Sequence, residues 1–219
     1  MSESAFFEPR ARKEATAAIK EIESQTSAEV VVTLRHLSGN YRHADFGFGF
    51  GFALLTLIVM WYLPVRFAPI AFFVDVTLGF LFGTFVCSHA PPLRRLLTSR
   101  KLRKHNVHQS ARAAFVDLGI ARCTGRWGIL VYVATFERTV EVVADIGVDA
   151  KALGAPYSEA IAKMKTALEG SPELDAFLAA LRSLGPALAT VLPHHDDDVN
   201  ELPDEVGVDD EAAAEESRA

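Results

Sequence analysis

The chain has 219 residues, half of them apolar, and a formal net charge of -6. Eleven acids and only one base, Arg218, lie in the tail from His194 onward, so the rest keeps 17 of the 28 acids and 21 of the 22 bases and is mildly basic, about +4. The length allows one good-sized domain or a small domain plus a membrane element, and the apolar composition favours the second. Two cysteines, Cys87 and Cys123, exclude a disulfide framework and indicate a reducing compartment.

The first 45 residues predict one half of a water-soluble α/β domain. Apolar residues recur at helical spacing within residues 9–25, which predicts a helix with one buried face. A β-branched run at residues 29–34 predicts a strand.

Two apolar segments then predict a transmembrane hairpin. Residues 46–63 contain no charge, and 18 residues of helix span about 27 Å, close to the ~30 Å hydrocarbon layer. Residues 67–87 carry only Asp75, with Pro69 in the first turn, and residues 64–66 remain for the connection. Two buried helices of a soluble core are the alternative, but both segments are apolar all round.

Glycines recur four residues apart in both segments. Gly47 and Gly51 form one pair, and Gly79 and Gly83 form the other. Such spacing lets helix backbones approach closely. We expect these glycines to pack the hairpin against itself, with a homodimer interface as the alternative.

Asp75 is the single acid within the predicted spans and shares a helical stripe with Gly79 and Gly83. A carboxyl group in a membrane is costly and marks a functional candidate. We expect Asp75 to serve packing or partner recognition, as a protonated acid that donates to a neighbour such as Thr56.

Basic residues follow the second span and predict its orientation. No acid occurs from Ala90 to Val116, whereas the connection between the spans carries Arg66 alone. The bases are Arg94, Arg95, Arg100, Lys101, Arg103 and Lys104. The positive-inside rule then predicts a two-span protein of the cytoplasmic (inner) membrane with both termini in the cytoplasm. The lipid bilayer is the expected partner; nucleic acid is not, because aromatic residues that could stack on bases are absent from the run.

The remainder predicts the second half of the domain. We expect a helix over residues 107–118 that ends at Gly119, a β-hairpin of residues 128–136 and 139–144, and helices over residues 158–168 and 174–190. The expected organisation is therefore residues 1–45 and 89–193 as two halves of one domain, residues 46–88 as an inserted transmembrane hairpin, and residues 194–219 as a disordered acidic tail.

The motif TGRWGILVYVATFERTVEVVADIGV, after SAEVVV and a helix that ends FVDLG, resembles the TPM domain family, which includes bacterial membrane proteins. The resemblance covers about residues 10–37 and 100–205, and its best part is residues 128–147. It implies a three-layer α/β/α sandwich. The family contains an acid phosphatase, metal-binding members and members that act by association with membrane complexes.

No catalytic motif is present, so catalytic residues are not predicted. Asp145 and Asp149 flank Gly147 after the last strand, where hard oxygen ligands suit Ca²⁺ or Mg²⁺. Turn capping is the alternative. The expected function is a membrane-tethered interaction module that assists assembly, stability or quality control of a membrane complex through a membrane-protein partner, in an undetermined oligomeric state. A metal-assisted phosphatase is the alternative.

Overall fold

The computed structural model describes residues 3–64, 67–195, 202 and 206–208. The chain divides into two compact units. The α/β unit contains Met1–Ser38 and Lys104–Ala219, and the hairpin unit contains Gly39–Arg103. Each unit is described by itself below.

The α/β unit is built on a four-stranded sheet with the order β3-β2-β1-β4. The strands are β1 (Glu29–Arg35), β2 (Gly128–Ala134), β3 (Thr139–Ala144) and β4 (Gly207–Val208). β1 and β2 are parallel neighbours, in register from Glu29 opposite Gly128 to Arg35 opposite Ala134. β2 and β3 form the predicted antiparallel hairpin. β1 precedes the hairpin unit in sequence and β2 follows it, so the centre of the sheet is formed by two segments that the hairpin unit separates.

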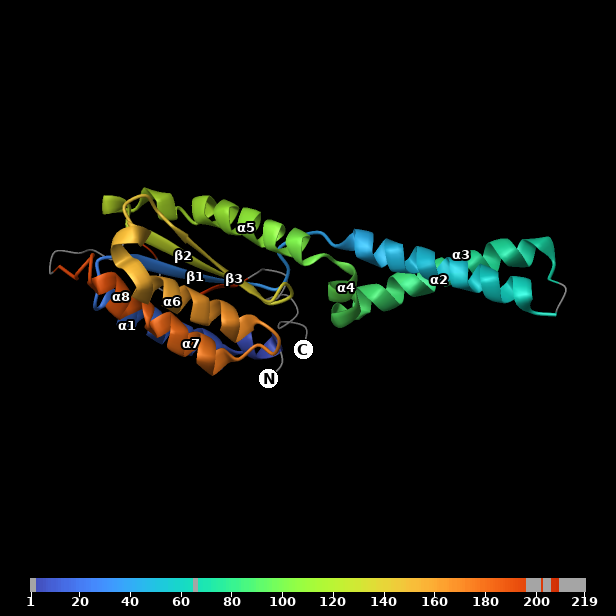
Figure 1. Cartoon of the computed structure of the whole chain (residues 1–219), viewed down its shortest axis with the longest axis horizontal. Helices are drawn as coiled ribbons and strands as arrows, with labels where there is room; N and C mark the ends of the chain where they lie inside the picture. Colours follow the sequence, from blue (N-terminus) through green and yellow to red (C-terminus); the bar gives the residue numbers. More distant parts are fainter. Residues whose placement is uncertain (1–2, 65–66, 196–201, 203–205, 209–219) are drawn as a thin grey trace. The chain divides into compact units, whose positions relative to one another are not determined.

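Helices cover both faces of this sheet (Figure 1). They are α1 (Pro9–Glu23), α5 (Arg100–Asp117), α6 (Ala150–Leu168), α7 (Leu174–Arg182) and α8 (Leu184–Ala189), with short 3-10 turns at Glu3–Phe6, Ile120–Arg122 and Thr124–Arg126. α5 lies on one side, and α1, α6, α7 and α8 lie on the other. The unit is therefore a mixed helix and strand fold in which the sheet is an internal layer.

Alternate strand residues supply two hydrophobic cores. Val30 and Val131 belong to the core beneath α1, α6, α7 and α8. Val31 and Leu130 belong to the core beneath α5, with Phe115. Because neighbouring strand residues face opposite sides, a strand between two helical layers must be apolar throughout. All seven residues of β2 are buried, as its continuous apolar sequence predicts.

The hairpin unit consists of α2 (Arg42–Tyr62), α3 (Pro69–His89), α4 (Pro91–Leu97) and the first residues of α5. α2 and α3 lie side by side along their length (Figure 1). Each has 21 residues, or about 31 Å of helix, and both are long and apolar enough to cross a membrane. Pro69 occupies the first turn of α3, as predicted.

Several elements extend beyond their predicted limits. α5 begins at Arg100 and not near residue 107. α6 begins at Ala150 because Asp149 caps it, and Gly154 kinks it at φ +65°. The predicted helix over 174–190 divides at Ser183 into α7 and α8. The sequence did not predict these limits because apolar residues do not recur at helical spacing in the polar or glycine-bearing turns concerned.

Part of the predicted disordered tail is ordered. Gly207 and Val208 form β4 and pair with Thr33 and Leu34 of β1. The physical reason is that the free edge of β1 offers unpaired backbone groups to any extended segment. Most of the tail lies outside the described residues.

Candidate functional site

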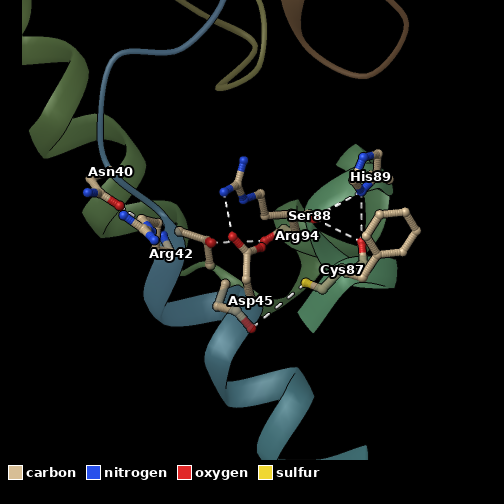
Figure 2. A network of polar contacts seen from close by, with 10 residues as sticks. Asn40, Arg42, Asp45, Cys87, Ser88, His89 and Arg94 are labelled. Atoms are coloured by element: carbon tan, nitrogen blue, oxygen red, sulfur yellow. Dashed lines mark hydrogen bonds and ion pairs between the residues drawn. The ribbon is translucent and has the colours of Figure 1, made fainter. Parts of the chain in front are cut away.

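A buried ion pair joins α2 to α4 at the base of the hairpin. Nη2 of Arg94 lies 2.5 Å from Oδ2 of Asp45. The Asp45 side chain is 5% exposed and that of Arg94 is 18% exposed, so little water screens the pair. Figure 2 shows the Arg94 guanidinium extending over the Asp45 carboxylate. The pair holds α4 against the start of α2.

The two ends of the hairpin meet around this pair. Sγ of buried Cys87, near the end of α3, lies 3.8 Å from the backbone oxygen of Ala44 in the first turn of α2 (Figure 2). The Ser88 hydroxyl donates to the Phe85 carbonyl at 2.8 Å, and the His89 ring lies within hydrogen-bond distance of the same oxygen. The Cys87 contact thus joins the end of α3 to the first turn of α2.

Large apolar side chains cover the outer surface of α2 and α3. Only 28% of the most apolar 18-residue stretch of α2 is buried, and only 17% of that of α3. A core helix of a soluble protein is mostly buried by comparison. The most exposed of these side chains are Phe50, Trp61, Tyr62, Ile70, Phe73, Leu78, Phe82 and Phe85. An apolar surface of this extent requires cover by something other than water.

The close contact between α2 and α3 uses Gly79, Gly83 and Gly49. An added Cβ at Gly79 meets Oγ1 of Thr56 at 2.5 Å, and one at Gly83 meets the Gly49 backbone at 2.9 Å. Gly79 and Gly83 therefore pack the hairpin as expected. The expectation needs correction for the first pair, because Gly47 and Gly51 have no atom within 4 Å of an added Cβ. α2 turns the intervening glycine toward α3.

Asp75 lies half-buried on α3, on the stripe predicted for it. It makes no hydrogen bond or ion pair within the described residues. The expected neighbour, Thr56, instead donates its hydroxyl to the Phe52 carbonyl at 3.0 Å and lies against Gly79. The carboxyl group of Asp75 is thus a polar group on an apolar helix that the described residues of the hairpin do not satisfy.

The six bases predicted to set the orientation differ in their surroundings. Arg94 is neutralised by Asp45, whereas Arg95 and Arg103 are half-buried. The exposed ones are Arg100, Lys101 and Lys104. The positive-inside rule counts bases and gives acids little weight, so the Asp45 pair does not weaken the orientation signal.

Asp145 and Asp149 are both engaged within the α/β unit. Nε of Arg126 lies 2.9 Å from Oδ2 of Asp145, and the Ile146 amide donates to Oδ1 at 2.7 Å. Asp149 caps α6 by accepting from the amides of Lys151 and Ala152. No cluster of three acidic, histidine or cysteine side chains suited to a metal occurs within the described residues.

The reasoning that placed a ligand site after the last strand also needs correction. β3 is antiparallel to β2, so its end lies beside Gly128, where β2 begins. Ligands of open α/β sheets gather at the other edge, beyond the carboxyl ends of the parallel strands. Gly147 is needed for a close chain crossing, since an added Cβ would lie 2.5 Å from the Arg126 carbonyl oxygen.

The carboxyl edge of β1 and β2 holds a polar group that sequence reasoning missed. The Ser38 amide donates to Oε1 of buried Glu137 at 2.8 Å, and the Tyr132 hydroxyl donates to Oγ of Ser38 at 3.2 Å. The Ser110 hydroxyl donates to the Ser38 carbonyl at 2.8 Å. Burial raises the pKa of Tyr132 above its usual value. These contacts fix the chain where it leaves β1.

Comparison with known proteins adds information on the fold. No protein-family model and no curated protein matches the chain. The NMR structure of BA42 protein from the psychrophilic bacterium Bizionia argentinensis is similar, with a TM-score of 0.52 and 16% sequence identity over 90% of this chain and 92% of that chain. At this identity the likeness concerns the fold alone. Membership of the TPM family therefore stays a prediction.

Proposed function

We propose that the chain is a membrane-tethered interaction module whose hairpin crosses the cytoplasmic membrane twice. Its α/β unit then lies in the cytoplasm with both termini and assists assembly, stability or quality control of a membrane complex. The observation that carries this proposal is the exposed apolar surface of α2 and α3, which burial inside the chain does not explain. A bilayer supplies the missing cover.

The pairing of β1 with β2 supports the same arrangement. These strands lie on either side of the hairpin in sequence and share seven register pairs. Both must occupy one compartment, so the intervening segment crosses the membrane an even number of times. Two helices of sufficient length meet this condition.

We also propose that the α/β unit is a three-layer α/β/α sandwich of the TPM type. Support comes from helices on both faces of the sheet and from the motif over residues 128–147. The engagement of Asp145 and Asp149 inside the fold favours a role in association over one in metal-assisted chemistry.

Accessibility of single cysteines to an impermeant reagent tests the topology. In a background with Cys87→Ser and Cys123→Ser, we expect Leu63→Cys, at the end of α2, to be labelled from outside intact cells. Gln109→Cys, on the exposed side of α5, should be labelled only after lysis. Membranes washed in carbonate should retain the chain. Equal labelling of both positions in intact cells, or release by carbonate, contradicts the proposal.

Asp75 offers a test of partner binding within the membrane. Because Asp75 has no hydrogen-bond partner within the described residues, we expect a neighbouring membrane protein to satisfy it. Asp75→Leu should abolish recovery of the chain in a larger complex from mild detergent, whereas Asp75→Asn keeps donor and acceptor atoms and should retain it. Identical complexes with Asp75→Leu exclude this role for Asp75.

A further inference from the structure

α4 presents two leucines to solvent beside a cluster of bases. Leu96 is 82% exposed and Leu97 is 45% exposed. Arg100 and Lys101 are exposed at the start of α5 and follow within five residues of Leu96. No acidic residue lies between Ala90 and Val116 to oppose these charges. Apolar side chains and bases together on a short helix are typical of a segment that lies on a lipid surface.

The position of α4 in the hairpin unit is fixed by specific contacts. Asp45 holds Arg94 in a buried ion pair. The Thr98 hydroxyl donates to the Arg94 carbonyl at 2.9 Å and ends α4. Leu96, two residues after Arg94 in α4, lies on the opposite side of the helix from that contact, and Leu97 beside it is also exposed. The ion pair therefore gives α4 a defined position within the hairpin unit.

We propose that α4 and the start of α5 form a docking surface for anionic lipid, with Leu96 and Leu97 inserted at the level of the headgroups and Arg100 and Lys101 on lipid phosphates. The proposal rests on membrane insertion of the hairpin. α3 ends at His89 and α4 begins at Pro91, so α4 lies directly at the end of the second proposed span. A cytoplasmic leaflet with anionic lipid attracts such bases.

The docking surface differs in chemistry from the hairpin itself. The spans require only a hydrocarbon layer and are indifferent to the headgroup. The bases beside α4 distinguish anionic from zwitterionic lipid. Lipid composition should therefore change the environment of α4 while leaving insertion of the hairpin unchanged.

The test uses the full chain in nanodiscs with an environment-sensitive fluorophore on Leu97→Cys, in the background with Cys87→Ser and Cys123→Ser. We expect the emission to rise as phosphatidylglycerol replaces phosphatidylcholine. Arg100→Gln with Lys101→Gln should raise the phosphatidylglycerol fraction at half-maximal change by about twofold or more. Lys151→Gln with Lys163→Gln removes the same charge from exposed positions of α6 and should leave the curve unchanged.

The outcomes separate the two proposals. A chain that does not enter nanodiscs overturns the proposed function and this inference with it. If the chain enters the discs but its emission does not change with the phosphatidylglycerol fraction, the docking surface is overturned and the proposed function is not. Inorganic phosphate added to phosphatidylcholine discs should leave the emission unchanged; a rise there identifies a site for free phosphate and also overturns the lipid proposal.

Discussion

The stability of the hairpin should depend on Asp45 and Arg94 together, because each neutralises the charge of the other. In a site with side chains 5% and 18% exposed, removal of one member leaves the other charged and poorly hydrated. We expect Arg94→Met to lower the free energy of unfolding in detergent by about 3 kcal/mol. Addition of Asp45→Asn to this variant should recover most of the loss. A double variant as unstable as the sum of both single variants contradicts the coupling.

Asp145 has a structural role that a stability measurement can separate from metal binding. We expect Asp145→Asn to cost about 2 kcal/mol, less than a fully buried pair, because the Arg126 side chain is 48% exposed. Loss of the cap in Asp149→Ala should cost about 1 kcal/mol. Millimolar Ca²⁺ should leave the melting temperature of the unsubstituted chain unchanged. A rise with Ca²⁺ that Asp145→Asn abolishes restores the metal hypothesis.

Tyr132 should make folding sensitive to alkaline pH. Its pKa is raised by burial, so the unfolded chain ionises this phenol at lower pH than the folded chain does. The resulting stability is complete below the unfolded pKa, about 10, and is lost as the pH rises through the folded pKa. Tyr132→Phe should flatten this alkaline loss in unfolding experiments. An unchanged slope excludes a contribution from Tyr132.

At the scale of elements, the spacing of α2 and α3 depends on which glycines face inward. Valine at Gly83 meets the Phe52 side chain and the Gly49 backbone, whereas valine at Gly47 meets open space. We expect Gly83→Val to lower the stability of the hairpin in detergent by about 2 kcal/mol and Gly47→Val to leave it unchanged. Equal effects at both positions contradict the packing described here.

Sequence patterns predicted the elements whose residues carry strong local signals. The strand at Thr139–Ala144 matches its prediction because alternation is a local property. Gly119 ends α5 with φ +72°, a conformation that glycine adopts without strain. α4 was missed because a seven-residue helix that begins with two prolines gives no useful periodicity.

The candidate site was predicted only in part, because its contacts are distant in sequence. Asp45 is one acid beside an apolar run, and its meaning depends on Arg94, 49 positions away. Gly49 and Gly47 occur in the same alternating stretch, and only the helix rotation decides which of them faces α3. Likewise, the parallel pairing of β2 with the distant β1 decides that Asp145 lies at the opposite edge of the sheet from the carboxyl ends of these strands.

At the scale of the whole molecule, α5 makes the return connection between two parallel strands, and the hairpin is an insertion before it. β1 and β2 need such a crossover because parallel strands cannot be joined by a tight turn. The hairpin therefore occupies a place where a soluble protein has an ordinary loop. Its removal should leave both strands and α5 intact.

A chain in which a short glycine-serine linker replaces residues 42–98 tests this organisation. We expect this variant to be soluble without detergent and to keep the circular dichroism of a mixed α/β protein, because both hydrophobic cores lie in the α/β unit. Aggregation of the variant in both water and detergent argues that the α/β unit needs the hairpin to fold.

The pairing of Glu29 with Gly128 also sets an order of events at the ribosome. The two residues are 99 positions apart, so at about 5 to 20 residues per second β1 waits roughly 5 to 20 s for its neighbour to be synthesised. Both apolar segments emerge during that interval. If the hairpin crosses a membrane as proposed, both spans are therefore available for insertion before β1 can pair with β2 and complete the centre of the sheet.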